Sequence, residues 1–159
     1  MARPHKASNP AEALVGVAPL AARWIERLLA SNEPPMTLAQ FLALRAIAAE
    51  PLAAAELARR AGVSGAAVSQ LIAALETAGW VERGSESADR RRQPLTLTPA
   101  GFEAFQSATR LLYGRLGELL ADLPRHEAQE LTRLLTRVEH VLGGAPPPRR
   151  PPPPPPKRP

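Results

Sequence analysis

Residues 56–75 contain two short amphipathic segments separated by a turn, and they read ELARRAGVSGAAVSQLIAAL. Gly62 in the turn can take the left-handed backbone conformation that ends a helix, because it has no Cβ. Val63 is expected to fill the angle between the two helices, and Ser64 is expected to cap the second one. This spacing predicts a helix-turn-helix, with an ordinary helical hairpin inside a larger bundle as the alternative. The apolar faces of the two helices consist of Leu57, Ala58, Ala61, Val68, Leu71, Ile72 and Leu75.

A short hairpin with a basic loop is predicted directly after the second helix, which Gly79 is expected to end. Residues 80–83 and 94–98 read as two strands, and a polar, turn-rich stretch with three adjacent arginines connects them. A hairpin that only packed against the helices would not need three arginines at its tip. The pattern therefore predicts a winged helix.

Further helices are predicted on both sides of this region. An amphipathic helix includes residues 13–29, and Pro19 is expected to kink or restart it. Thr37 is expected to cap the next helix, which ends before Pro51. The buried face expected for that helix consists of Leu38, Phe41, Leu42, Leu44 and Ile47.

After the wing, Thr98 and Pro99 begin a helical region of about 24 residues, roughly 36 Å long. Gly114 and Gly117 weaken its middle, and a last helix ends at residues 143–144. The apolar stripes of these helices are more than one small winged helix can cover, so a second subunit is the simplest way to bury the remainder. The stripes are Trp24, Ile25, Leu28 and Leu29; Phe102, Phe105, Leu112 and Leu116; and Leu131, Leu135, Val138 and Leu142.

The expected fold is mainly α with a small β-hairpin wing. Residues 34–98 would form the winged helix-turn-helix, and residues 10–32 and 99–143 would form a helical dimerisation region. Residues 1–9 are expected to be a flexible N-terminus. Residues 144–159 are expected to be a disordered, basic, proline-rich tail, because ten of the last fourteen residues are proline.

The formal charge of +5 is distributed unevenly, with four of the positive charges in the proline-rich tail. Any charge that attracts DNA to the folded part must therefore be a local patch. The absence of cysteine excludes disulfides and thiolate metal sites. The three histidines, at positions 5, 126 and 140, are far apart in the sequence, so no metal site is expected.

The N-terminus has a basic start and an apolar run, which superficially resemble a secretory signal. Because the helical periodicity continues past that run, an amphipathic helix is the better interpretation. No stretch approaches about 18 uninterrupted apolar residues, so a cytoplasmic protein without a membrane span is expected.

Three stretches together resemble the multiple antibiotic resistance regulator (MarR) family of bacterial transcription factors. They are MTLAQFLALRAI at 36–47, ELARRAGVSGAAVSQLIAALETAGWVER at 56–83 and DRRRQPLTLTPAG at 89–101. The resemblance covers roughly residues 12–142. It implies an obligate homodimer built from the terminal helices, pseudo-palindromic operators in double-stranded DNA, and release by small molecules that are often aromatic and anionic.

The same resemblance implies a DNA-binding wing. The family pattern of an acid, one residue, an arginine and a strand ending in Leu-Thr before a glycine-containing helix start is met by Asp89, Arg91, Leu97, Thr98 and Gly101. In similar proteins the arginine enters the minor groove and the acid helps to hold the wing. The wing residues assigned to DNA binding are Asp89, Arg90, Arg91 and Arg92.

The second helix of the helix-turn-helix departs from the family pattern, because no cation lies between Ser64 and Leu75. Gln70 is the only long side chain there that could make a bidentate base contact, most naturally with adenine. Ser69 could reach a base edge or a phosphate, and the small residues would allow close approach and contact with a thymine methyl. The residues expected to face DNA are Ser64, Gly65, Ala66, Ala67, Ser69, Gln70, Ala73 and Ala74.

Phosphate contacts would then be made by Arg59, Arg60 and Arg83, together with the wing arginines. The alternative for Arg59 and Arg60 is a solvated helix face on which Glu56 is their i+3 or i+4 partner. A small-molecule effector is expected near Trp24, where the terminal helices would meet the winged helix.

A DNA-binding regulator of transcription, a repressor in preference to an activator, is the predicted function. The alternative is a dimeric ligand sensor or scaffold with weak DNA binding that acts through its proline-rich tail. No cofactor and no enzymatic activity are expected, because Ser64 and Ser69 have no neighbouring base and there is no glycine-rich phosphate loop.

Overall fold

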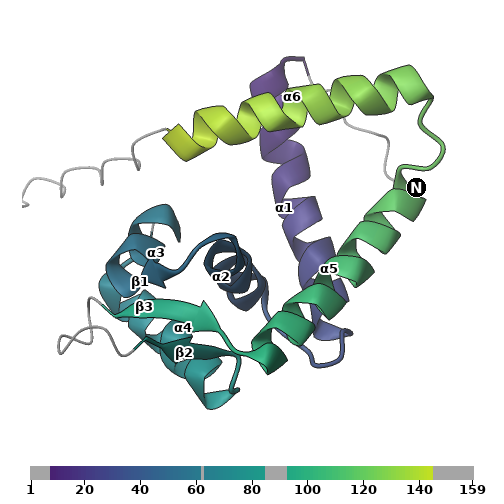
Figure 1. The fold of residues 1–159 in the computed structure, drawn as a ribbon. Coiled ribbons are helices and arrows are strands. Elements are labelled where there is room, and N and C mark those ends of the chain that lie inside the picture. Colours follow the sequence, from purple (N-terminus) through teal and green to yellow (C-terminus); the bar gives the residue numbers. More distant parts are fainter. Residues whose placement is uncertain (1–7, 62, 85–92, 145–159) are drawn as a thin grey trace, which may run out of the picture. The chain divides into compact units, whose positions relative to one another are not determined.

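The computed structural model describes residues 8–61, 63–84 and 93–144 (Figure 1). The chain divides into two compact units, the first ending at Ala121 and the second beginning at Asp122. The second unit contains α6 (Arg125–Gly144). The first contains α1 (Pro10–Ala30), α2 (Leu38–Ala49), β1 (Leu52–Ala53), α3 (Ala54–Ala61), α4 (Gly65–Thr77), β2 (Val81–Arg83), β3 (Pro94–Leu97) and α5 (Pro99–Leu119).

The predicted fold class, mainly α with a small wing, is confirmed. The sheet has three antiparallel strands in the order β1-β3-β2, with Val81 opposite Leu97 and Leu52 opposite Leu95. The two-stranded hairpin predicted from the sequence was therefore incomplete. Because β1 contains two residues, it is too short to show any periodicity in the sequence.

The helix-turn-helix consists of α3 and α4. The hydroxyl of Ser64 accepts a hydrogen bond from the Ala67 amide at 3.2 Å, which confirms Ser64 as the cap of α4. The prediction that Val63 fills the angle between the helices is wrong, because its side chain is 46% exposed. Ala61, expected on the buried face of α3, is also exposed. The prediction for Gly62 concerns a residue outside those that the structure describes.

The core of the first unit is aliphatic, and its fully buried large side chains come from α1, α2, α4 and β3. Leu42 was expected on the buried face of α2 but is 49% exposed. At 3.6 residues per turn it lies about 200° around the helix from Leu44, which is fully buried. The largest fully buried residues are Leu29, Leu44, Ile72, Leu75, Leu95 and Val68.

The two long helices of this unit are continuous. Asn9 caps α1, which passes through Pro19 without ending, so the expectation of a restart there was wrong. α5 likewise passes through Gly114 and Gly117. Phe102, assigned to its apolar stripe, is exposed, because α5 approaches the core with its small residues instead. The buried positions of α5 are Gly101, Ala104, Ala108 and Leu112.

A hydrogen-bonded corner follows α4. Gly79 has a positive φ of 71°, its amide donates to the Glu76 carbonyl, and the Trp80 amide donates to the Leu75 carbonyl at 2.9 Å. These are the two bonds of a Schellman motif, which ends a helix and satisfies its last carbonyl groups. Gly79 therefore ends the helical region as predicted and directs the chain into β2.

The start of α5 packs directly against this corner. Thr98 donates its amide to the Trp80 carbonyl at 3.0 Å and its hydroxyl to the Gly79 carbonyl at 2.6 Å. The same hydroxyl accepts from the Gly101 amide and so caps α5. A Cβ at Gly101 would lie 1.9 Å from the Trp80 carbonyl oxygen, so no larger residue fits without moving the backbone.

α6 presents no buried residue along the part that the structure describes, and Leu131 and Val138 are half-buried. Among the described residues, no helix combines the length and the apolar character that crossing a membrane would require. The expectations for the flexible N-terminus and the proline-rich tail fall largely on residues 1–7 and 145–159, which lie outside the described part.

We predict that Gly101→Ala destabilises the fold by at least about 1–3 kcal/mol, because the new methyl group meets backbone atoms of Trp80. Gly114→Ala is the matched control on the same helix, since a Cβ there meets nothing within 4 Å. The control should stabilise the protein by about 0.5–1 kcal/mol through helix propensity. Urea denaturation followed by circular dichroism measures both changes, and an unaltered midpoint for Gly101→Ala would contradict the close contact.

Candidate nucleic-acid interface

The surface of α4 that faces solvent is built from small residues and one amide. Because Val68, Ile72 and Leu75 recur at helical spacing and are buried, the opposite face of the helix is left exposed. Gln70 lies on that exposed face, as the sequence predicted. All the other residues assigned to DNA contact on this helix are exposed as well, namely Gly65, Ala66, Ala67, Ser69, Ala73 and Ala74.

The two serines of this region have different local roles. Ser64 uses its oxygen to cap α4, and Ser69 donates its hydroxyl proton to the Gly65 carbonyl at 2.8 Å. Each side chain is exposed. In this arrangement the Ser69 oxygen can still accept a hydrogen bond, so a donor on a base edge suits it better than an acceptor.

A hollow of about 390 Å³ lies between α3 and α4. Sequence reasoning missed it, although the alanine-rich composition of both helices was a signal that the helices could leave space between them. Its walls are short side chains, so the surface here is recessed rather than filled. The residues that line the hollow are Ala54, Ala55, Ala58, Gly65, Ala66, Val68 and Ser69.

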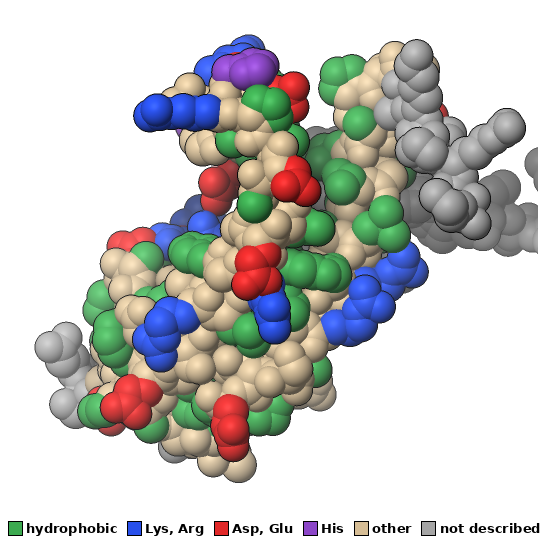
Figure 2. Space-filling model, turned by 90° about the vertical axis from the view of Figure 1, so that its right-hand side faces the viewer, with side chains coloured by type: hydrophobic (Ala, Val, Ile, Leu, Met, Phe, Trp, Pro, Cys, Tyr) green, Lys and Arg blue, Asp and Glu red, His purple; other side chains and the backbone are tan. Residues whose placement is uncertain are grey.

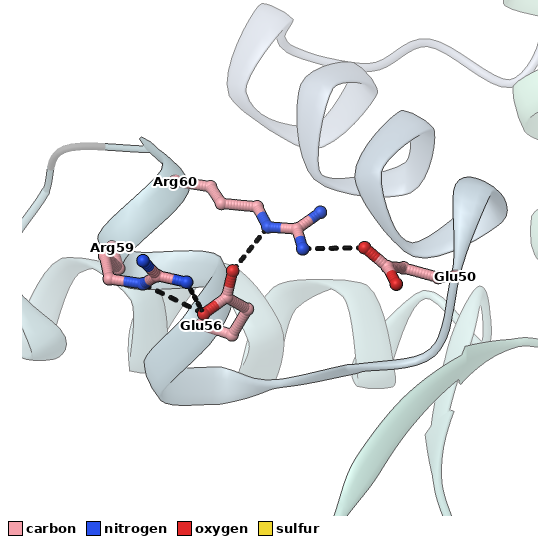
Figure 3. A network of polar contacts seen from close by, with 4 residues as sticks. All are labelled: Glu50, Glu56, Arg59 and Arg60. Atoms are coloured by element: carbon pink, nitrogen blue, oxygen red, sulfur yellow. Dashed lines mark hydrogen bonds and ion pairs between the residues drawn. The ribbon is translucent and has the colours of Figure 1, made fainter. Parts of the chain in front are cut away.

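Arg59 and Arg60 take part in an ion-pair network with two glutamates (Figure 3). Arg59 donates through Nε and Nη2 to one carboxylate oxygen of Glu56, at 2.9 and 2.5 Å. Arg60 donates through Nε to the other oxygen of Glu56 and through Nη2 to Glu50, both at 2.6 Å. The pairing of both arginines with Glu56, which the sequence left open as the alternative, is therefore present.

The network also fixes the charge of its members. Hydrogen bonds from Arg59 and then from Arg60 hold the pKa of Glu56 below its ordinary value. Hydrogen bonds to Glu56 and Glu50 raise the pKa of Arg60. Glu56 is therefore a carboxylate and Arg60 a cation at neutral pH.

Arg83, the third arginine assigned to phosphate contact, is also paired. Its Nε lies 2.7 Å from a carboxylate oxygen of Glu76, which joins β2 to α4. Each of the three arginines thus has a glutamate partner in the same unit. Whether any of them contacts DNA stays a prediction.

The wing residues Asp89, Arg90, Arg91 and Arg92 lie outside the residues that the structure describes. The strands on either side of them are present, and Arg83 of β2 lies opposite Leu95 of β3. The Gly84 amide donates to the Pro94 carbonyl at 2.8 Å, which extends the pairing toward the loop. The hairpin that would carry the wing is therefore formed at its base.

Trp24 lines an apolar groove of about 550 Å³ between α1 and α5. None of the described residues that line this groove belongs to the winged helix, and an effector site near Trp24 stays a prediction. A separate hollow of about 610 Å³ lies at that junction and includes Trp80, Pro34 and Arg110. Trp24 lies within α1 and Trp80 follows the end of α4, and nothing in the sequence tells which of the two faces the junction.

In the described part of the chain, no group of three or more His, Asp or Glu side chains could hold a metal ion.

Comparisons with known proteins point to one family. The model of the MarR family matches residues 35–92, from just before α2 through the last wing arginine. The HTH-type transcriptional repressor Rv2887 of Mycobacterium tuberculosis is 33% identical over 104 residues, which cover 65% of this chain and 75% of that protein.

Solved structures of the MarR family protein Rv2887 share the fold. The complex with DNA has a TM-score of 0.68 at 26% identity and covers 83% of this chain and 98% of that one. The complex with salicylic acid has a TM-score of 0.67 at 28% identity and covers 84% and 98%. The helix-turn-helix, the base of the wing and these matches agree, and this chain belongs to the MarR family of transcriptional regulators.

Proposed function

We propose that this chain is a transcriptional repressor that binds a pseudo-palindromic operator as a homodimer. The observation that carries the proposal is the exposed face of α4, which Ser64 caps and which a helix-turn-helix would place in the major groove. A relative of the same fold has been solved in complex with DNA and is described as a repressor. A regulator of this kind acts where the chromosome is, so we also propose a cytoplasmic location.

Base recognition in this proposal depends on Gln70. Its neighbours on the exposed face are alanines and Ser69, so the helix can approach the bases closely without steric conflict. An amide at this position can bond N6 and N7 of adenine together, and the alanine methyls suit thymine methyls. Sequence preference would therefore come from one polar side chain and from shape.

Gln70→Ala should relax the preference at one base pair in each half-site by about 1–3 kcal/mol, because the bidentate contact is lost. Fluorescence anisotropy with a set of single-substituted operator duplexes measures this. Gln129→Ala, which removes an exposed glutamine from α6, is the control and should leave the preference unchanged. An equal loss of affinity for every duplex would make Gln70 a positioning residue rather than a base reader.

The wing contributes a second, sequence-independent contact in this proposal. It rests on Asp89 and the three arginines that follow it, which match the family pattern. An arginine in the minor groove positions the protein through phosphate and groove contacts, and it makes binding depend on salt.

Arg91→Ala should weaken operator binding by about 1–3 kcal/mol and lower the salt slope by about one unit, since one cation near the phosphates is removed. Anisotropy titrations at several potassium chloride concentrations give both quantities. Arg125→Ala removes the same charge from α6, in the second unit, and should change neither quantity. If Arg91→Ala also left both unchanged, the wing would have no part in binding.

The homodimer is proposed because large apolar side chains remain exposed on each long helix. On α1 they include Val17 and Leu20. Figure 2 views the molecule from the side of α5 and shows hydrophobic side chains on this face. On α6, Leu135 is 55% and Leu142 is 60% exposed. Apolar surface of this extent marks an interaction site. A second copy would cover it, with residues 10–32 and 99–143 as the dimerisation region.

Leu135→Glu combined with Leu142→Glu should give monomers that bind a palindromic operator weakly. Both side chains are exposed in the single chain, so the charges would not disturb its own core. Gln129→Glu combined with Thr136→Glu, at the same seven-residue spacing on α6, is the control and should stay dimeric. Analytical ultracentrifugation with anisotropy tests both variants, and a dimer with unaltered affinity after the leucine substitutions would refute the proposed interface.

Release by a small molecule is the last part of the proposal. The Trp24 groove is apolar, and Arg23 and Arg27 line it, so it can accept an aromatic anion with its carboxylate near a guanidinium. A relative solved with salicylic acid supports a ligand of this class. Such a ligand would shift DNA binding by its difference in affinity for two arrangements of the dimer.

A second candidate function follows from the absence of any cation on α4. A chain whose helix attracts phosphates weakly could be a dimeric ligand sensor or scaffold that acts through its proline-rich tail. The titrations above separate the two, because a scaffold would bind the DNA upstream of its own gene no better than random DNA.

A further inference from the structure

Both arginines of α3 form ion pairs with glutamates in the protein without DNA. Glu56 is the centre of their network, since each of its carboxylate oxygens accepts from a different arginine (Figure 3). Glu50 at the end of α2 accepts from Nη2 of Arg60. Both N–H groups on the Nε–Nη2 edge of each arginine are therefore bonded to carboxylates.

The atoms involved matter for phosphate binding. A guanidinium binds a carboxylate or a phosphate best through two N–H groups on one edge. Arg59 uses Nε and Nη2 for Glu56, and Arg60 divides the same two groups between Glu56 and Glu50. A phosphate that took this edge would have to displace a carboxylate or share the arginine with it.

The described residues of the surrounding domain carry no surplus of positive charge that could override these pairs. Within the described residues of 34–98 there are four arginines and four glutamates, so their formal charges cancel. The arginines are Arg45, Arg59, Arg60 and Arg83, and the glutamates are Glu50, Glu56, Glu76 and Glu82. Phosphate attraction on this part of the domain therefore depends on how tightly the glutamates hold the arginines.

We propose that Glu56 is an internal competitor of the DNA phosphates, which holds Arg59 and Arg60 and so keeps sequence-independent DNA affinity low. This inference rests on the proposed DNA-binding function. In this scheme Glu56 lowers the affinity for every sequence by the same factor, because it acts on the phosphate contribution that all sequences share. Discrimination between sequences is left to Gln70, which can contact base edges.

The exposure of the Arg59 and Glu56 side chains is consistent with competition between Glu56 and a DNA phosphate for the arginine. The Arg59 side chain is 77% exposed while that of Glu56 is 25% exposed, so the arginine can reach outward but the acid stays near α3. Exposed ion pairs are weak, so a phosphate can replace the carboxylate as the partner of an arginine. After that exchange the Glu56 charge remains within a Debye length of the phosphate and opposes binding.

The opposite role, in which Glu56 prepares the arginines for phosphate, predicts the opposite result. A preparing residue would leave the Nε–Nη2 edge of each guanidinium open to a phosphate, whereas Glu56 takes both groups of this edge in Arg59 and shares them with Glu50 in Arg60. The two roles are therefore separated by the direction in which affinity changes when the charge of Glu56 is removed.

Glu56→Gln removes the charge while keeping the size of the side chain. We expect it to tighten binding by roughly 3–10-fold at low salt and to raise the salt slope by about one to two units, because two arginines are released to phosphates. The increase should be the same for a duplex from upstream of the protein's own gene and for a random duplex of equal length. Anisotropy titrations of both duplexes over a range of potassium chloride concentrations measure it.

Glu130→Gln is a matched control. Glu130 accepts two hydrogen bonds from Arg133 in an i,i+3 pair on α6, and Arg133 lowers its pKa, as Arg59 and Arg60 lower the pKa of Glu56. This variant changes the net charge equally but leaves α3 untouched, so affinity should not change. An equal increase in both variants would mean a general charge effect and would overturn the proposal.

The combination of Glu56→Gln with Arg59→Ala and Arg60→Ala provides the second test. The increase should disappear in this background, because the arginines that Glu56 restrains are gone. Weaker binding by Glu56→Gln, an increase limited to one duplex, or an increase that persists without the two arginines would each overturn the inference. Thermal denaturation would confirm that the variants are folded. If the wild-type chain bound neither duplex, the proposed function itself would be contradicted. This outcome would be seen before any variant is tested, so it is distinct from a failure of the Glu56 proposal.

Discussion

The contact between the start of α5 and the Trp80 carbonyl is the constraint on which the rest of the first unit depends. Gly101 allows the approach, and Thr98 bonds both carbonyls of the corner that ends α4. The end of α4, the start of β2 and the first turn of α5 are thereby joined at one place. Since β3 leads directly into α5, the same contact holds the base of the wing against the helix-turn-helix. The orientation of α4 is therefore set by backbone contacts remote from its exposed face.

The exposed face of α4 and the charges around it bear on two separate contributions to DNA binding, the attraction to phosphates and the contacts to base edges. Small residues on α4 favour close approach, while the described charges of the winged helix-turn-helix cancel. Affinity that comes mainly from phosphates is insensitive to sequence, whereas contacts to base edges carry the discrimination. Arginines held by glutamates reduce the first contribution without touching the second. The network of Glu56 with Arg59 and Arg60 thus acts on the affinity common to all sequences and leaves discrimination to α4.

Much of the candidate site could be predicted because its signals are local. Ser64 precedes a run of helix-forming residues, so its role as a cap needs only neighbours in the sequence. Gln70 is exposed because Val68, Ile72 and Leu75 define the buried face by their spacing. Val63 and Leu42 were misplaced because an apolar residue does not reveal whether anything packs against it. The surroundings of Trp24 could not be predicted either, since only the path of α1 and α5 decides what lies beside it.

The sequence by itself determined the order and type of every element except β1, the caps of α2, α4 and α5, and the family to which the chain belongs. These depend on helical periodicity, turn residues and motif spacing, which act over a few residues. Only the tertiary structure decided that Glu50 reaches Arg60 across ten positions, that β1 completes the sheet, and that position 101 tolerates no side chain. Each of these arises where segments distant in the chain meet. Their positions depend on how the whole core packs, and no short stretch of sequence specifies that packing.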